Sequence, residues 1–284
     1  MIEKVTIDMP VYPALLREIK DPPRQLYCLG NISLLDGRCA AVVGSRKSSR
    51  YGSRTAEDIA GRLASDGITV VSGMALGIDT AAHTGALRTG GGTIAVLGCG
   101  PDVCYPPENA RLKKEIEAAG LVISEYPPGT KPQRYHFPQR NRIISGLSEL
   151  TAVVQAGRSS GALITAELAA EQGREVCAVP GNIDSSFSIG SNKLIKDGAC
   201  PVISTGDISA MMGVDKPADS EIRKCLSGIE QEIYHLLEGY GELTIDDLSI
   251  LTGSAPGYIS SVVTVMEMKG FVFSDLGKIF VAKD

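Results

Sequence analysis

Between residues 36 and 213 the chain repeats one pattern: a short apolar run, a glycine-containing break and a segment with apolar residues at helical spacing. The apolar runs are rich in Val, Ile and Ala and alternate little, which is typical of parallel strands covered on both faces. Such strand–helix repeats predict an open α/β sheet of the doubly wound, Rossmann-like kind. The predicted strands span residues 39–43, 68–71, 93–97, 121–124, 150–155, 175–179 and 201–203.

Helical segments separate these runs. In the first of them Ala56, Ile59, Ala60 and Leu63 recur at helical spacing and predict one buried face. We therefore expect residues 37–213 to form the main domain. The predicted helices span residues 51–65, 78–88, 109–119, 139–147, 162–172 and 191–196.

The two ends of the chain differ from this pattern. The first 36 residues are punctuated by proline and too short for a domain, so we expect them to pack on the main domain. Residues 214–284 predict a linker and a helix over 217–239, helices over 244–251 and 255–269, and a hairpin that turns near Leu276-Gly277. Three helices and a hairpin of this size predict a small winged-helix-like domain.

Composition narrows the class of protein. The 284 residues are 43% hydrophobic and 21% charged, which favours a folded chain. No run approaches the roughly 18 apolar residues of a membrane span, and the N-terminus is charged where a secretory signal would be apolar. The seven cysteines are scattered without a CxxC pair, so neither structural zinc nor a disulfide framework is expected. We expect a cytoplasmic protein without metal or cofactor.

Charge is unevenly distributed along the chain. The net charge is −5, but residues 214–284 alone carry 6 basic and 12 acidic residues. Basic residues gather in two stretches, residues 44–54 without any acid and residues 131–158 with Glu149 as the only acid. A local basic patch is what an anionic ligand senses, whatever the overall charge.

The first basic stretch opens with Gly44, Ser45, Arg46 and Lys47, directly after the first predicted strand. In an open α/β sheet this turn lies at the carboxyl end of the strand, where helix-start amides favour an anion. The spacing is neither GxGxxG nor a P-loop, so no mononucleotide cradle is specified. A phosphate site and a plain turn with solvated basic side chains both fit.

The second predicted strand leads into Ser72 and Gly73, which could offer a hydroxyl and an amide at the same sheet edge. Asp79 and His83 follow at a spacing of four on the next helix. We interpret them as a hydrogen-bonded structural pair, since no second group of ligands supports a metal.

Residues 137–144 form the most unusual stretch, with Tyr135 just before it. Guanidinium groups beside aromatic rings suit a ligand that alternates phosphates with stackable bases. The alternative is a helix start with solvated arginines and a core phenylalanine. The candidate residues here are Arg134, Phe137, Arg140, Asn141 and Arg142.

Further turns at the same edge also carry hydroxyl, glycine or basic residues that suit an anion. Ser160 and Gly161 open a helix after the fifth predicted strand, Thr165 follows one turn later, and Lys193 lies beyond the sixth strand. Several anion-binding turns along one edge favour an extended polyanion over a single nucleotide. No catalytic set can be assembled, because a nucleophile needs a convergent base and the chain holds only His83, His136 and His235.

Taken together, these motifs resemble the DNA-processing protein A family over residues 12–213. The matching stretches are Asp21-Pro-Pro-Arg-Gln-Leu-Tyr27 with Gly30-Asn31, Val43-Gly-Ser-Arg46, Ser72-Gly73, Gly77-Ile-Asp79 with Ala82-His83, Phe137-Pro-Gln-Arg-Asn-Arg-Ile-Ile144, Ser160-Gly-Ala-Leu-Ile-Thr165 and Pro180-Gly181.

The resemblance implies an extended Rossmann-like domain that binds single-stranded DNA, forms a homodimer through residues near 189–198, and loads the RecA recombinase during natural transformation. It implies that the DNA pocket uses Gly44, Ser45, Arg46, Phe137, Arg140 and Arg142, with Arg134 beside them. Many members carry a helical, SAM-like domain before the Tyr12-Pro13 stretch, where this chain has eleven residues.

Two other functions compete with this interpretation. The main domain also resembles a phosphoribohydrolase family whose glycine-rich loop binds a nucleotide and supplies a catalytic acid. Here the corresponding stretch, Ser159 to Glu167, has serines and an alanine where that loop has glycines. A transcription regulator working through the winged helix is disfavoured, because its third helix, 255–268, contains no Lys or Arg for contacts to DNA phosphates.

Overall fold

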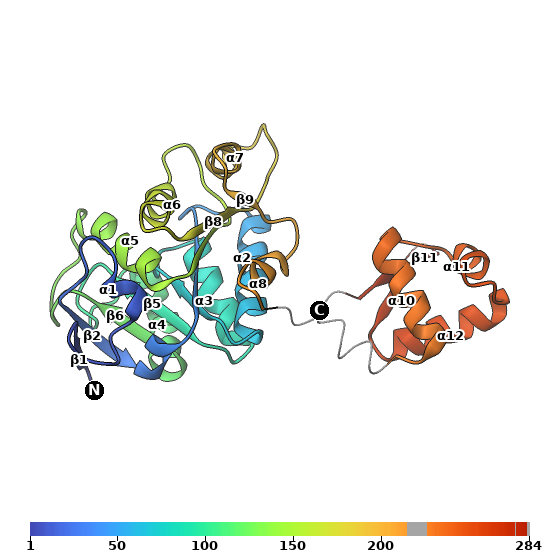
Figure 1. Ribbon diagram of the computed structural model, residues 1–284, viewed down its shortest axis with the longest axis horizontal. Helices are drawn as coiled ribbons and strands as arrows, with labels where there is room; N and C mark the ends of the chain where they lie inside the picture. The colour runs from blue at the N-terminus through green and yellow to red at the C-terminus, as the bar shows by residue number, and fades with distance from the viewer. Residues whose placement is uncertain (215–225, 276, 283–284) are drawn as a thin grey trace. The chain divides into compact units, whose positions relative to one another are not determined.

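The computed structural model describes residues 1–214, 226–275 and 277–282. The chain divides into two compact units, Met1–Val214 and Asp215–Asp284 (Figure 1). Among residues 1–214 the structure forms a nine-stranded sheet in the order β1-β2-β6-β5-β4-β3-β7-β8-β9. The pairs from β6 to β9 are all parallel, which confirms the predicted Rossmann-like α/β class. The strands are β1 Glu3–Thr6, β2 Gln25–Gly30, β3 Cys39–Val43, β4 Thr69–Ser72, β5 Thr93–Leu97, β6 Leu121–Ser124, β7 Leu150–Val153, β8 Glu175–Ala178 and β9 Cys200–Pro201.

Helices cover both faces of this sheet. Successive residues of β3 enter different cores: Ala41 and Val43 pack on one side, and Ala40 and Val42 pack on the other. The first core includes residues of α1, α5 and α6, while α2, α3 and α8 belong to the second and α4 to a smaller third one. The helices are α1 Ala14–Arg17, α2 Arg50–Ser65, α3 Ile78–Arg88, α4 Ala110–Ala119, α5 His136–Leu147, α6 Gly161–Glu171, α7 Ile189–Lys196 and α8 Asp207–Met211, with 3-10 turns η1 Ile32–Asp36 and η2 Pro107–Asn109.

The N-terminal segment does more than pack on the main domain. Its strands β1 and β2 extend the sheet, and β2 pairs antiparallel with β6 from Tyr27 opposite Ser124 to Gly30 opposite Leu121. The sequence analysis missed both strands, because prolines surround them and β2 is half-buried on one side. Only β1 is an edge strand; β2 pairs with β1 on one side and with β6 on the other, and the surrounding prolines lie outside both strands.

Strand order fixes where a ligand site is expected. From β3 the chain adds β4, β5 and β6 in one direction along the sheet, and from β7 it adds β8 and β9 in the other. The strand order therefore reverses between β3 and β7. In open α/β sheets the crevice outside the carboxyl ends of two such strands is where ligands bind.

The smaller unit contains α10 Gly228–Tyr240, α11 Ile245–Thr252, α12 Pro256–Met268 and the hairpin of β10 Val272–Asp275 with β11 Lys278–Val281. These elements match the predicted winged-helix-like order and share one apolar core that includes Ile233, Leu248 and Ile259. The expected linker from residue 217 and the turn residue Leu276 lie outside the described residues. Among the described residues no single helix is long and apolar enough to cross a membrane; α11 and α12 pass that test only as a pair bent by 112°.

Candidate nucleic-acid interface

The turn after β3 is held by its neighbours at the point where the strand order reverses. The amide of Ser45 donates to the carbonyl of Gln155, which follows β7, at 2.7 Å. The carbonyl of Ser45 accepts from the amide of Ile78 at 3.2 Å. Gly44 has no room for a side chain, because a Cβ would lie 2.6 Å from Ile78 and 2.8 Å from the Gln155 carbonyl. Gly44 and Ser45 therefore fix the place from which Arg46 emerges.

Arg46 and Phe137 meet across this edge, although 90 residues separate them in the chain. The Arg46 guanidinium lies over the Phe137 ring, 5.4 Å from its centroid, in a cation–π arrangement. The ring in turn rests on the backbone after β5, where a Cβ on Gly98 would be 3.0 Å from it. Arg46 itself is exposed. A cation and an aromatic face are thus presented together at the carboxyl ends of β3 and β5.

More aromatic rings surround Phe137. Tyr105 lies with its ring centroid 5.3 Å from that of Phe137, and Tyr135, just before α5, is exposed. Tyr135 contacts the buried His136 edge-on, and Tyr126 stacks on the same imidazole with the centroids 3.9 Å apart. The predicted Arg46 and Phe137 are therefore part of a larger aromatic surface. The sequence analysis did not select Tyr105, which lies eight residues after the third predicted strand. The signal that could have identified it was an aromatic residue in the connection after that strand.

The basic residues around this surface are largely without acidic partners. Among the described residues, none of Arg46, Lys47, Arg134 and Arg158 forms an ion pair, and all four are exposed. By contrast Arg38, on another part of the unit, pairs with Glu149 at 2.6 Å. An anion approaching the edge would meet cations that no carboxylate already neutralises.

Arg140 does not belong to this exposed set, and the expectation that it faces a ligand requires correction. The residue is only 5% exposed. Its Nη1 donates to the carbonyl of Gly73 after β4 at 2.5 Å and to the carbonyl of Val96 in β5. Burial lowers the pKa of Arg140 to about 10, and the carboxylate of Asp79 opposes this shift. Arg140 therefore stays charged at neutral pH and ties α5 to two strand ends.

Asp79 and His83 are both buried, but each bonds to a different partner. Asp79 Oδ2 accepts from the amide of Ala75 at 3.2 Å; burial raises its pKa and the charge of Arg140 opposes that shift. His83 Nδ1 lies 2.7 Å from Thr93 Oγ1, whose own proton goes to the carbonyl of Val70. Burial lowers the pKa of His83 to about 3, so the ring is neutral and donates from Nδ1. The predicted hydrogen bond between Asp79 and His83 was wrong.

Arg142 is also engaged within the protein. Its Nη2 donates to both carboxylate oxygens of Glu125 at 2.8 and 2.9 Å, and its Nε donates to Asp21 at 3.3 Å. The side chain is 15% exposed. Nε and Nη2 are thus engaged with carboxylates, and Nη1 is buried, which leaves the guanidinium poorly placed for a phosphate. The resemblance places Arg142 and Arg46 in one pocket, but in the structure the two arginines have different partners and different exposure.

Three other predicted residues are buried rather than presented to a ligand. Ser72 is fully buried and donates to the carbonyl of Val42 at 2.7 Å. Gly73 lies against Arg140, whose guanidinium would be 2.6 Å from a Cβ at that position. Thr165 is 2% exposed within α6. All three residues therefore lie inside the protein, and we assign them structural roles.

The start of α6 lies next to α5. Asn141 Nδ2 is 3.4 Å from the carbonyl of Gly161, and Ser160 caps the helix by accepting from the amide of Ala162 at 3.4 Å. Gly161 is exposed with open space where a Cβ would project. This cluster remains a candidate for a backbone contact at the same edge.

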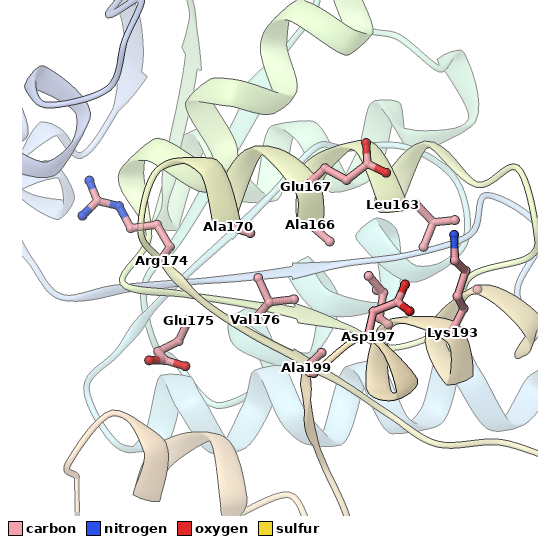
Figure 2. Close-up of a pocket in the computed structure, with 13 residues that line it drawn as sticks. Leu163, Ala166, Glu167, Ala170, Arg174, Glu175, Val176, Lys193, Asp197 and Ala199 are labelled. Carbon is pink, nitrogen blue, oxygen red and sulfur yellow. The ribbon is translucent and has the colours of Figure 1, made fainter.

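Lys193 lies in a separate feature, a groove of about 450 Å³ between α6 and α7. Figure 2 shows Lys193 and Leu163 near one end of this groove and Arg174 near the other. Leu163, Val176 and Leu194 give it an apolar floor and walls. The structure therefore assigns Lys193 to this groove and not to the aromatic surface around Phe137.

No metal centre is formed by the described side chains of residues 1–214, 226–275 and 277–282: nowhere do three or more His, Cys, Asp or Glu residues converge.

The position of Arg140 leads to a test of stability. Arg140→Met would leave two carbonyls unbonded and the buried Asp79 without its opposite charge. We expect the free energy of unfolding to fall by about 3–5 kcal/mol, as when one member of a buried charge pair is removed. Urea denaturation followed by circular dichroism measures this change.

Two variants complete that experiment. Arg134→Met removes an exposed arginine and should change stability by no more than about 0.5 kcal/mol. Arg140→Met combined with Asp79→Leu should be more stable than Arg140→Met alone, because no charge is then left unpaired. An unchanged stability of the single Arg140 variant would contradict the assigned role.

Comparison with known proteins agrees with these features. The family model described as DNA recombination-mediator protein A matches residues 3–213. The protein Smf of Synechocystis is 41% identical over 257 residues, which cover 89% of this chain and 63% of that protein. The DNA processing protein DprA of Streptococcus pneumoniae is 48% identical over 199 residues, covering 70% of each. The chain thus spans less than two thirds of the Synechocystis protein's length.

Solved structures give the same result. The structure of DNA processing protein A from Streptococcus pneumoniae is 46% identical, covers 74% of both chains and has a TM-score of 0.71. That of DNA processing protein A from Helicobacter pylori, studied for its single-stranded DNA binding mode, is 31% identical, covers 75% of this chain and 97% of that one, and has a TM-score of 0.68. The resemblance inferred from the motifs is thereby confirmed. The chain belongs to the DNA recombination-mediator protein A family.

Proposed function

We propose that this protein is a recombination mediator that binds single-stranded DNA along the carboxyl edge of its sheet. The observation that carries the proposal is the unpaired Arg46 guanidinium held over the Phe137 ring at the reversal of strand order. Family membership supports it, and the Helicobacter pylori relative is a protein with a described single-stranded DNA binding mode.

The chemistry of the edge suits a single strand. A guanidinium can hold a phosphate through two parallel hydrogen bonds, and aromatic rings stack on any base because every base has a π-face. Both groups are exposed or half-buried here, whereas the bases of a duplex are stacked on one another and unavailable. The described residues at this edge are strand ends, turns and the first residues of α5 and α6, so we expect the binding to be largely blind to sequence.

We also propose that the protein acts without catalysing a reaction. The acid that a phosphoribohydrolase-like mechanism would need, Glu167, lines the groove between α6 and α7 and not the surface around Arg46. Release of a free base from AMP-type nucleotides would favour the enzymatic alternative.

The first test compares strand forms. A labelled poly-dT oligonucleotide should bind more tightly than a duplex of equal length, because only the single strand offers unstacked bases to Phe137. Fluorescence anisotropy at two salt concentrations measures both affinities. Equal or tighter binding of the duplex would refute the proposal.

A second test concerns Arg46. Arg46→Ala should weaken single-strand binding by about 1–3 kcal/mol, as for a charge-assisted hydrogen bond. It should also reduce the slope of log K against log salt by roughly 0.7, the contribution of one phosphate contact. Arg111→Ala, on the outer face of α4 with a 94% exposed side chain, serves as the matched control. If the Arg46 variant keeps both affinity and slope, Arg46 is only a solvated turn residue.

At a finer level, we propose that the protein forms a homodimer and loads RecA onto the strand that it binds. The groove between α6 and α7 has an apolar lining, and the segment before α7 exposes Ile183 and Phe187. Apolar groups gathered in this way fit a protein interface.

Sedimentation should show a species of twice 29.9 kDa at micromolar concentration, and the dimer should speed RecA assembly on the strand. A monomer, or no effect on assembly, would contradict the corresponding part.

A further inference from the structure

Tyr105 occupies an unusual position in the connection between β5 and η2. Its side chain is 40% exposed, so it does not serve the core. Yet its ring lies 5.3 Å from the Phe137 ring, centroid to centroid, with the two planes inclined by 35°. The turn after β3, the connection after β5 and the start of α5 thus bring Arg46, Tyr105 and Phe137 into one neighbourhood.

The connection that carries Tyr105 is held in place by hydrogen bonds. The Gly100 amide donates to the carbonyl of Thr130 at 2.9 Å, and the Val103 amide donates to the carbonyl of Gly100 at 3.0 Å. Asp102 accepts from the amide of Gly129 at 2.8 Å, and the carbonyl of Cys99 accepts from Ser124 Oγ at 2.6 Å. An exposed aromatic ring on such a braced loop loses little conformational entropy when a ligand stacks on it.

The spacing of the two rings limits how a base can bind. Stacked bases follow one another by about 3.4 Å, so a base sandwiched between two rings needs a gap of about 7 Å. The separation of 5.3 Å is too small for that arrangement. The two rings are therefore neighbours and not the two walls of a slot, and Tyr105 is the more exposed of the two. Successive bases of an extended strand match this geometry.

Charge separates the expected role of Tyr105 from that of Arg46. Arg46 is an unpaired cation and suits a phosphate, whereas Tyr105 presents an uncharged ring whose face suits a base.

We propose that Tyr105 is a second base-stacking position, which takes the nucleobase next to the one held at Phe137. This inference rests on the proposed binding of single-stranded DNA. It assigns the edge a minimum footprint of two consecutive bases, with the phosphate contact supplied by Arg46.

The test measures binding of labelled oligo-dT to the full chain at two salt concentrations. Tyr105→Ala should weaken binding by about tenfold, within the range for loss of one stacked base, and should leave the salt slope unchanged. Tyr105→Phe keeps the ring and should bind within about twofold of wild type. Tyr240→Ala, at a 63% exposed tyrosine at the end of α10, is the control for removal of a surface ring and should have no effect.

Oligonucleotides with one abasic site identify the contact directly. At one position of the strand, the abasic site should weaken wild-type binding but add nothing to the loss in Tyr105→Ala. Additive losses at every position would overturn the inference, as would unchanged binding by Tyr105→Ala or equal losses in the Ala and Phe variants. If wild type itself fails to bind the strand, the proposed function falls; if wild type binds and Tyr105→Ala binds equally well, only this inference falls.

Discussion

The geometry of the candidate interface depends on the hydrogen bonds that the buried guanidinium of Arg140 donates. This guanidinium joins three elements, because α5 carries it and its donors reach the carbonyls of Gly73 and Val96 at the ends of β4 and β5. A charge in the interior is costly unless it is hydrogen-bonded and balanced. Here Nη1 bonds to the two carbonyls and the charge of Asp79 favours the cation, while Nε is buried without a hydrogen-bond partner among the described residues.

Two sets of contacts link Arg140 to Arg46. Phe137 lies one turn before Arg140 in α5, so fixing the arginine also fixes the ring. On the other side, Asp79 accepts from the amide of Ala75, and Gly77 sits so close to the turn that a Cβ would be 2.4 Å from the carbonyl of Ser45. The same buried charges thus hold both the Phe137 ring and the turn from which Arg46 projects. Neither Arg140 nor Asp79 needs to contact a ligand to matter for binding.

This division of labour explains why the basic residues of one short stretch behave so differently. Arg134 is exposed, Arg140 is buried, and Arg142 is paired with Glu125 and Asp21. Arg134 precedes α5, whereas Arg140 and Arg142 lie within it, where helical geometry turns them to different sides. The acids that neutralise Arg142 come from the N-terminal segment and from the end of β6, both remote in the chain.

The sequence by itself determined the parallel sheet, its strands from β3 to β8 and most of the covering helices, because runs of Val, Ile and Ala that alternate with helical segments are typical of strands buried on both faces. It missed α8, and it placed the last strand at 201–203 where β9 is Cys200–Pro201. It also determined that Arg46 follows the end of a strand, since a glycine-containing turn marks that end. The tertiary structure alone decided that β1 and β2 join the sheet and that Tyr105 lies beside Phe137. It also decided that Arg140 and Arg142 donate their hydrogen bonds to groups within the protein. The physical reason is that exposure and pairing depend on which distant segments arrive at a residue, and periodicity along the chain carries no record of that.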